Sequence, residues 1–379
     1  MGVCREGVIK MEPIRILQVV THMNRGGAET MLMNYYRNID RTKIQFDFLA
    51  HRSEPKAYDD EIRALGGRIY HLSPVDPFGF NGYKKELKKF FAEHKEYKIV
   101  HAHLDTLSTY VLNVAKEAGV TVRIAHSHNT KMDFDFKFPI RLYSKLKLKK
   151  TANQYFACGK DAGKWLFGSK EIDNVTILNN AIDVKGYKYD QQKALEVKRS
   201  LNIEDKFVIG HIGRFYKQKN HEFLIDIFYE VYKKNKQSVL LLVGDGVLKP
   251  QIIEKVSKLN LSENVKFLGV RSDVADLVQA FDVFLFPSLY EGLPVTLIEA
   301  QAAGLKCIVS DCITNECDLT GNMKFLNLKD SPEKWAEKVL SEYEGFVKTD
   351  TSEFIKRGGF DVRENVKWLE EFYLTEWRK

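Results

Sequence analysis

The chain has 379 residues, a length that fits two domains better than a single hydrophobic core. Apolar residues make up 44% and charged residues 29%, and the 24 Phe and 17 Tyr argue against disorder. The net charge of +7 is uneven: residues 1–200 hold 34 Lys+Arg against 23 Asp+Glu (+11), and residues 201–379 hold 24 against 28 (−4). We therefore expect two domains with different partners, and a nucleic acid or an anionic membrane surface is a candidate partner of the first half.

Several other classes of protein are excluded by the sequence. No apolar run approaches the roughly 18 residues of a membrane-spanning helix, and residues 1–12 lack the apolar segment of a signal peptide, so we expect a poorly ordered leader there. Five cysteines at irregular spacing indicate a reducing compartment and not a disulfide framework. Cys312 and Cys317 do not have the spacing of zinc ligands. We therefore expect a cytoplasmic protein.

Short runs of β-branched and aromatic residues alternate with segments of helical period along the chain, which is typical of a parallel α/β sheet. In the first half we expect strands at 14–20, 46–50, 68–72, 99–103, 123–126, 154–157 and 175–178, and helices that include 29–37, 58–65 and 84–94. In the second half we expect strands at 207–212, 238–243, 265–268, 283–287, 306–309 and 324–326, and helices that include 221–234, 249–259, 274–280, 295–303 and 332–343.

The boundary between the halves lies in a polar stretch in which we expect no strand. We assign residues 1–185 to the first domain, 201–361 to the second and 186–200 to a linker. Residues 362–379 carry apolar side chains at helical spacing, so we expect a final helix that could pack on either domain. Ligands bind beyond the carboxyl ends of the strands in open parallel sheets. Two doubly wound Rossmann-like domains therefore predict a site for two substrates in the cleft between them.

A glycine-rich turn follows the first expected strand and opens a helix. Gly26 and Gly27 would let backbone N–H groups approach a phosphate, and the helix N-terminus adds a positive dipole. The turn matches neither a dinucleotide-binding G-x-G-x-x-G nor a Walker A loop. It predicts phosphate binding, with an ordinary tight turn as the alternative.

Two cations flank the first loop of the second half. Gly213 and Arg214 come just after an expected strand, and Lys219 comes just before an expected helix. A guanidinium fork and an ammonium group at the carboxyl edge of a sheet suit a diphosphate. A solvated basic loop is the alternative.

The most informative segment is 283–304, where a buried strand is followed by a loop with Glu291 and a helix with Glu299. A carboxylate accepts hydrogen bonds from adjacent sugar hydroxyls. Exposed N–H groups at Gly292 and Leu293 would favour an anion beside them. The alternatives are charge complementarity at a helix N-terminus for Glu291 and a surface helix position for Glu299, and the apolar neighbours of Glu299 weaken the second.

Glu291 and Glu299 form a Glu-x7-Glu motif inside a Phe-Pro-Ser-x-x-Glu-Gly-x-Pro-x-x-x-x-Glu-Ala frame. With the two cations, the Val-Gly-Asp-Gly run at 243–246 and two His-x-His pairs, this frame closely resembles the retaining glycosyltransferases of family 4, which have the GT-B fold. The resemblance covers residues 14–377. It implies an α/β GT-B protein of two Rossmann-like, doubly wound parallel-sheet domains that face a central cleft, with the final helix crossing back onto the first domain.

The resemblance implies roles for the second-half residues. Arg214 and Lys219 would neutralise the donor diphosphate, and Glu299 would hold the ribose hydroxyls. Glu291 and the backbone amides that follow it would grip the transferred sugar.

In the first half, the resemblance implies that Gly27 lies against the phosphates and that His128 contacts the sugar near the reacting centre. His126 is two residues away, and we expect it to alternate onto the other face if the strand persists, so which of the two faces the site stays open. We keep His101 and His103 as core or supporting residues, because lone histidines are more often structural than catalytic.

Breaking a glycosyl–phosphate bond builds negative charge on the leaving diphosphate, so its stabilisation by Arg214, Lys219 and helix N-terminal amides should be the largest catalytic contribution. The resemblance implies retention by a front-face route in which the leaving phosphate helps take the acceptor proton. Neither glutamate then needs to be a nucleophile. We expect no metal and no other cofactor. The Asp-x-Asp at 133–135 lies in an aromatic loop, which favours a solvated or acceptor-binding loop.

Two segments, 140–150 and 84–91, interleave apolar residues with cations. Basic amphipathic helices bind anionic membrane surfaces, so peripheral association with the inner face of the plasma membrane is one interpretation. An ordinary solvated lysine face is the other. No nucleic-acid recognition motif is visible.

We therefore predict a retaining, metal-independent hexosyltransferase that uses a nucleotide-diphosphate sugar, with uridine diphosphate implied by the family. The acceptor would be a glycan or a lipid-linked oligosaccharide in bacterial capsular or exopolysaccharide biosynthesis. A nucleotide-sugar 2-epimerase of the same fold and a non-catalytic nucleotide-sugar-binding protein are the alternatives. The Glu-x7-Glu frame argues against the first, and the intact charged residues argue against the second.

Overall fold

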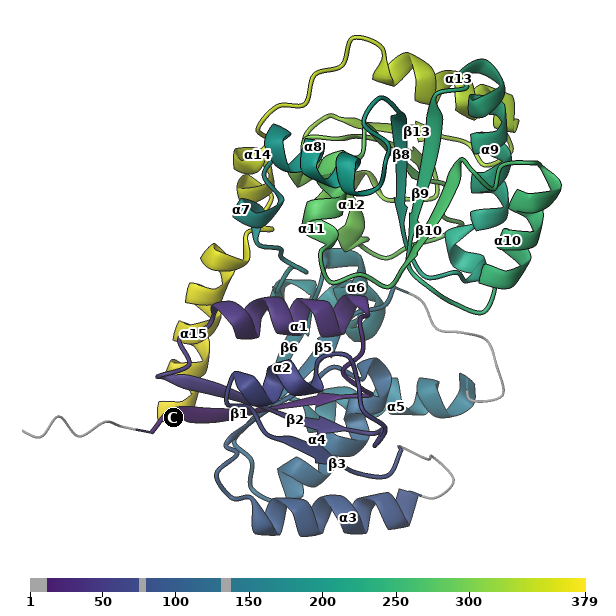
Figure 1. The fold of residues 1–379 in the computed structure, drawn as a ribbon. Coiled ribbons are helices and arrows are strands. Elements are labelled where there is room, and N and C mark those ends of the chain that lie inside the picture. Colours follow the sequence, from purple (N-terminus) through teal and green to yellow (C-terminus); the bar gives the residue numbers. More distant parts are fainter. Residues whose placement is uncertain (1–11, 75–79, 131–137) are drawn as a thin grey trace, which may run out of the picture. The chain divides into compact units, whose positions relative to one another are not determined.

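The computed structural model describes residues 12–74, 80–130 and 138–379. The chain forms two compact units, Met1–Asn180 with Val362–Lys379 (unit 1) and Ala181–Asp361 (unit 2). Each unit contains one sheet with helices packed against it (Figure 1). Among the described residues, no helix combines the length and the apolar character needed to cross a membrane.

Unit 1 has a seven-stranded parallel sheet in the order β3-β2-β1-β4-β5-β6-β7. Its strands are β1 (Ile14–Val20), β2 (Ile44–Ala50), β3 (Ile69–His71), β4 (Ile99–Ala102), β5 (Val122–Ser127), β6 (Gln154–Ala157) and β7 (Val175–Ile177). Its helices are α1 (Gly27–Asn38), α2 (Asp59–Ala64), α3 (Phe80–Glu93), α4 (Ser108–Glu117), α5 (Phe138–Thr151), α6 (Lys160–Phe167) and α15 (Val362–Arg378).

Unit 2 has a six-stranded parallel sheet in the order β10-β9-β8-β11-β12-β13. Its strands are β8 (Phe207–Ile212), β9 (Ser238–Val243), β10 (Val265–Gly269), β11 (Val283–Phe286), β12 (Lys306–Ser310) and β13 (Met323–Leu326). Its helices are α7 (Val184–Tyr187), α8 (Gln191–Ser200), α9 (His221–Lys234), α10 (Lys249–Lys258), α11 (Val274–Leu277), α12 (Val295–Ala302), α13 (Pro332–Tyr343) and α14 (Ser352–Arg357).

Alternation along the strands gives each sheet two different faces. In β1, Leu17 and Val19 join the apolar cluster formed with α3, α4 and α6. Gln18 lies on the opposite face, where its side chain meets Tyr373 of α15. The final helix therefore covers the face of the unit 1 sheet that carries polar side chains.

The α/β architecture of two doubly wound parallel sheets is confirmed, and every strand expected from the sequence is present within a few residues of its expected bounds. The linker expected at 186–200 is wrong. Helix α8 forms there and packs on the short 3-10 helix Val278–Ala280. The carboxylate of Asp190 caps α8 by accepting from the backbone N–H groups of Gln192 and Lys193, and this N-cap signal outweighs the polar composition.

The boundary between the units also falls earlier than expected, after Asn180. Ile182 already belongs to unit 2, where its N–H donates to the carbonyl of Phe360 at 2.9 Å.

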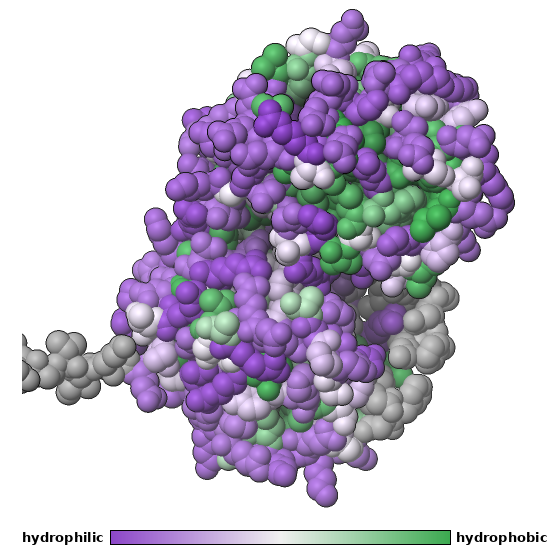
Figure 2. Space-filling model, in the orientation of Figure 1, coloured by the Kyte–Doolittle hydropathy of each residue, from purple (hydrophilic) through white to green (hydrophobic). Residues whose placement is uncertain are grey.

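Hydrophilic residues cover most of the visible surface (Figure 2), as expected for helices that bury one apolar face against a sheet.

Gly210 of β8 leaves room for the ring of Phe281, which a Cβ atom would overlap. We expect Gly210→Ala to lower the free energy of unfolding of unit 2 by roughly 1–3 kcal/mol, because a buried ring would have to move. Gly82→Ala, in helix α3 of unit 1, is the control for an added Cβ atom that meets nothing within 4 Å, and it should not lower the midpoint. Urea unfolding measures both, and an unchanged midpoint for Gly210→Ala would contradict the packing.

Candidate functional site

In unit 2 the predicted residues gather where the strand order reverses. Strand β8 lies in the middle of the sheet, between β9 and β11. The strands that follow β8 in the chain are added on one side of it up to β10 and on the other side from β11 onward, so the loops after β8 and β11 diverge at this point. Such switch points are the usual ligand sites of open parallel sheets. Gly213, Arg214 and Lys219 lie in the loop after β8, and Glu291 lies in the loop after β11.

A largely buried ion pair joins these two loops. The distance from Lys219 Nζ to Glu291 Oε1 is 2.7 Å, and the side chains are 14% and 9% exposed. Gln218 Nε2 donates to Glu291 Oε2 at 3.1 Å and to the backbone oxygen of Tyr290 at 3.0 Å. The carboxylate of Glu291 is thus held on both oxygens, and the positions of the two loops depend on each other.

The predicted cation Arg214 is exposed and lies with its guanidinium carbon 5.2 Å from the centroid of the Tyr216 ring. Its loop crosses the loop after β9 so closely that a Cβ atom at Gly244, which has φ of +135°, would overlap the carbonyl of Gly213. Glycine permits both the positive φ and the close approach of the two loops at this crossing. Among the described residues, no hydrogen bond or ion pair joins Arg214 to Lys219 or to Glu291.

Glu299 lies on α12 and is 7% exposed, so the alternative of a surface position is wrong. Burial raises the pKa of its carboxyl group, and a hydrogen bond from Tyr187 works in the opposite direction. The Tyr187 hydroxyl donates to Glu299 Oε1 at 2.7 Å. A carboxylate that accepts one hydrogen bond can accept further hydrogen bonds from the hydroxyl groups of a ligand.

The loop residues Gly292 and Leu293 are half-buried and precede α12, whose N-cap is Pro294. The predicted backbone amides therefore lie at the positive end of the helix that carries Glu299.

In unit 1 four histidines gather at the ends of β4 and β5. The rings of His126 and His128 stack with centroids 4.2 Å apart, and those of His101 and His103 with centroids 4.4 Å apart. The expectation that His126 alternates away from His128 is wrong, because residues two apart on an extended chain share a face.

Burial keeps this cluster uncharged. It lowers the pKa of His128 to about 4, and it lowers the pKa of His101, His103 and His126 well below the usual value, with repulsion between neighbouring imidazoles adding to the effect. His101, His103 and His126 also place one nitrogen each within 4.8 Å of the others.

Asp105 is a site residue that we did not predict. It has φ of +47°, and its carboxylate accepts from the backbone N–H of His128 at 2.8 Å and from Asn129 Nδ2 at 2.6 Å. Burial raises the pKa of this carboxyl group. The sequence could have indicated this residue, because Asp105 closely follows an expected strand and the His-x-His pair at its end.

The glycine turn of unit 1 has the expected local form. Helix α1 begins at Gly27 with Gly26 as its N-cap, and a Cβ atom at Gly27 would meet nothing within 4 Å. The carboxylate of Glu29 folds back over Gly26 and lies 3.5 Å from His22 Nδ1. An anion bound at this turn would have to displace that carboxylate.

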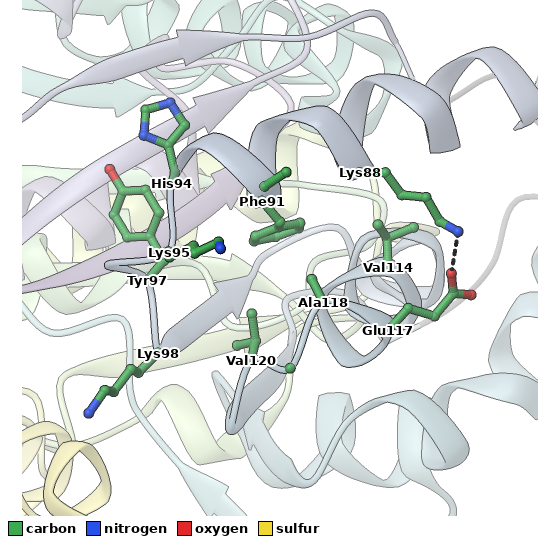
Figure 3. A pocket seen from close by; sticks show the side chains of 12 residues that line it. Lys88, Phe91, His94, Lys95, Tyr97, Lys98, Val114, Glu117, Ala118 and Val120 are labelled. Atoms are coloured by element: carbon green, nitrogen blue, oxygen red, sulfur yellow. Dashed lines mark ion pairs between the residues drawn. The ribbon is translucent and has the colours of Figure 1, made fainter.

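A pocket of about 390 Å³ lies elsewhere in unit 1, at the amino ends of β4 and β5 (Figure 3). Phe91, Tyr97 and Val120 line it, and Lys88 pairs with Glu117 at its rim with 3.0 Å between nitrogen and oxygen. The histidine cluster lies at the carboxyl ends of the same strands.

The predicted loop residues 133–135 lie outside the described part of the chain.

Comparison with known proteins decides the family. The family model described as "Glycosyl transferases group 1" matches residues 206–344. The chain is 40% identical to "Putative glycosyltransferase EpsF" of Bacillus subtilis over 95% of this chain and 96% of that protein. The chain belongs to the group 1 glycosyltransferases.

Two other relatives have more specific names. One is "Capsular polysaccharide biosynthesis glycosyltransferase CapH" of Staphylococcus aureus, 26% identical over 96% of this chain and 99% of that protein. The other is "UDP-Gal:alpha-D-GlcNAc-diphosphoundecaprenol alpha-1,3-galactosyltransferase" of Escherichia coli, 27% identical over 62% of this chain and 64% of that protein.

Solved structures show the same fold. The complex of Anabaena Alr3699/HepE with UDP-glucose superposes with a TM-score of 0.78 at 18% identity, over 95% of this chain and 99% of that one. The predicted GT-B fold of this glycosyltransferase is therefore confirmed.

The buried histidines make the stability of this glycosyltransferase depend on pH. Unfolded histidines take up protons as the pH falls through about 6.5, whereas His128, with a pKa of about 4, stays neutral in the fold. The stabilisation is therefore complete above pH 6.5 and is lost below it. We expect the urea concentration at the unfolding midpoint to decrease as the pH is lowered from about 7.5 to about 5.5. The variant His71→Gln, which changes an exposed histidine, should show the same decrease. A midpoint that does not fall would contradict the neutral cluster.

Proposed function

We propose that this glycosyltransferase transfers a sugar from a uridine-diphosphate donor with retention of the anomeric configuration, as a member of family 4. The observation that carries the proposal is the buried Lys219–Glu291 ion pair at the switch point of unit 2. It lies in the segment that the group 1 family model matches. Because the ion pair already holds the ammonium group of Lys219 in place at this edge, the group can stabilise a diphosphate without a rearrangement of the protein when the donor binds.

The two cations have different tasks in this proposal. Arg214 is exposed and free to swing its guanidinium fork onto the phosphate oxygens. Lys219 is held in place by Glu291 and shares its charge with the leaving diphosphate as the glycosyl bond breaks. Together they neutralise the leaving group, so the reaction needs no metal ion.

The two glutamates recognise the two sugars of the donor. Glu299 accepts from the ribose hydroxyls, and Tyr187 keeps its carboxylate oriented. Glu291, together with the amides of Gly292 and Leu293, binds the transferred sugar. Neither carboxylate acts as a nucleophile, and the leaving phosphate takes the proton of the acceptor hydroxyl.

The roles of the unit 1 residues are part of the same proposal. His128 contacts the sugar, and the Gly26–Gly27 turn approaches the phosphates through its backbone. The acceptor is a lipid-linked oligosaccharide in capsular or exopolysaccharide assembly, a proposal supported by the names of the CapH and diphosphoundecaprenol relatives.

Donor binding tests these assignments. We expect Glu299→Ala and Lys219→Ala each to weaken binding of the active nucleotide sugar by roughly tenfold or more, since each removes a charged hydrogen-bonding partner. Lys258→Ala, at an exposed lysine paired with Glu254 on α10, should leave binding unchanged. Isothermal titration with a panel of nucleotide sugars, followed by a transfer assay, measures both. Unaltered donor binding by Glu299→Ala would contradict the assignment.

We further propose that α5 binds an anionic membrane surface. Its outer face exposes three apolar side chains next to its lysines: Leu142 at 43%, Tyr143 at 57% and Leu146 at 70%. The second basic segment differs, because the large apolar side chains within it, Leu87, Phe90 and Phe91 of α3, are buried. The lysines of α3 thus lack large exposed apolar neighbours on their own helix in the described structure, and we assign membrane binding to α5.

The two helices provide a matched comparison. We expect replacement of Lys145, Lys147, Lys149 and Lys150 by Gln to weaken binding to phosphatidylglycerol vesicles roughly tenfold or more. The same change at Lys84, Lys85, Lys88 and Lys89 removes equal charge and should have a much smaller effect. Sedimentation with vesicles measures both, and equal losses would refute a specific role for α5.

A further inference from the structure

Two chains of hydrogen bonds run through the histidine cluster of unit 1 and meet at the side chain of Gln18. Gln18 is fully buried in β1. Its Oε1 lies 2.9 Å from His103 Nε2, and its Nε2 lies 3.4 Å from the hydroxyl oxygen of Tyr373. Because an amide oxygen only accepts and an amide nitrogen only donates, Gln18 gives each chain a direction.

The first chain ends at His128. Gln18 Oε1 accepts, so the hydrogen of His103 lies on Nε2. A neutral imidazole carries one N–H, so His103 Nδ1 must accept, and it does so from His128 Nε2 at 2.9 Å. His128 Nδ1 is therefore left with a lone pair, and it has no partner among the described residues.

The second chain ends at His126. Gln18 donates to the Tyr373 hydroxyl, whose own hydrogen then lies toward His101 Nδ1 at 2.7 Å. His101 Nε2 donates in turn to His126 Nδ1 at 3.0 Å. His126 therefore carries its hydrogen on Nε2, another buried atom that lacks a partner in the described part of the chain.

The orientation of the Gln18 amide sets both chains together. A rotation of the amide by 180° would reverse every bond and place the hydrogen on Nδ1 in all four rings. In the observed orientation all four rings carry it on Nε2, which is the more stable tautomer of an isolated histidine side chain. The observed orientation is thus favoured by each ring of the cluster.

We propose that Gln18 is a positioning residue, which fixes the hydrogen of His128 on Nε2 and so presents His128 Nδ1 as an acceptor for a hydroxyl group of the sugar substrate. The inference rests on the proposed function, in which His128 contacts that sugar. Leaving a buried acceptor and a buried donor unpaired costs roughly 1–3 kcal/mol each. A sugar hydroxyl both donates and accepts, so carbohydrate is the ligand class that best pairs the free atoms of His128 and His126.

Metal binding is the competing use of this cluster, because three of its histidines could approach one ion. Both ring nitrogens of His101 and of His103 already take part in hydrogen bonds, as does His126 Nδ1. An ion would have to break several of these bonds. The hydrogen-bonded arrangement therefore accounts for these rings without an ion.

Nitrogen-15 NMR of the 379-residue protein with labelled histidine tests the inference without any substrate. Two-bond proton–nitrogen correlations at about pH 7.5, with the His128 signals assigned by His128→Gln, report which ring nitrogen carries the hydrogen. We expect a protonated Nε2 and an unprotonated Nδ1 in His128. A hydrogen on His128 Nδ1, or displacement of the ring signals by one equivalent of Zn²⁺, would overturn the inference.

Two variants of the same cluster separate positioning from simple packing. In Gln18→Met we expect His128 to become a mixture of tautomers, with kcat/KM for the active nucleotide sugar reduced roughly tenfold. Tyr373→Phe cuts only the second chain, so His128 should keep its tautomer. An unchanged His128 spectrum in Gln18→Met would overturn the inference. If no nucleotide sugar reacts, the proposed function fails, while the tautomer measurement still decides the role of Gln18.

Discussion

The parallel direction of the strands is the constraint on which the functional chemistry of this protein depends. Each unit has one edge at which its strands end, and at that edge loops from distant parts of the chain meet. Arg214, Lys219 and Glu291 reach the same edge of unit 2 from the ends of β8 and β11. His103 and His128 do so in unit 1 from the ends of β4 and β5. The order of the strands therefore determines which side chains can act together.

At both edges several polar groups are paired with one another before any substrate is present. Lys219 and Glu291 neutralise each other in a nearly buried environment, where either charge alone would be costly. The histidines avoid charge altogether, because burial favours their neutral form and leaves them as directional hydrogen-bond donors and acceptors. Such preorganisation lets a site stabilise a developing charge without reorganising during the reaction.

Much of this arrangement could be predicted from the sequence, because strand patterns and motif order depend on local residues. The strands, the two-sheet architecture and the positions of the charged residues near strand ends follow from that information. The pairing of Lys219 with Glu291 could not be predicted, since it joins residues 72 positions apart across two loops. The role of Tyr187 beside Glu299 was missed for the same reason. The helix at α8 was missed because its polar composition hid the cap at Asp190.

The stereochemistry of the product tests the proposed chemistry most directly. The proposed front-face route has Arg214 and Lys219 stabilise the leaving diphosphate and predicts that the acceptor attacks from the face that the diphosphate leaves. Proton NMR of the fresh disaccharide formed from an α-linked nucleotide sugar should therefore show an α-linked product and no trapped glycosyl ester on Glu291. A β-linked product would contradict front-face transfer, and a glycosyl ester on Glu291 would show that this glutamate is a nucleophile and not a binding residue.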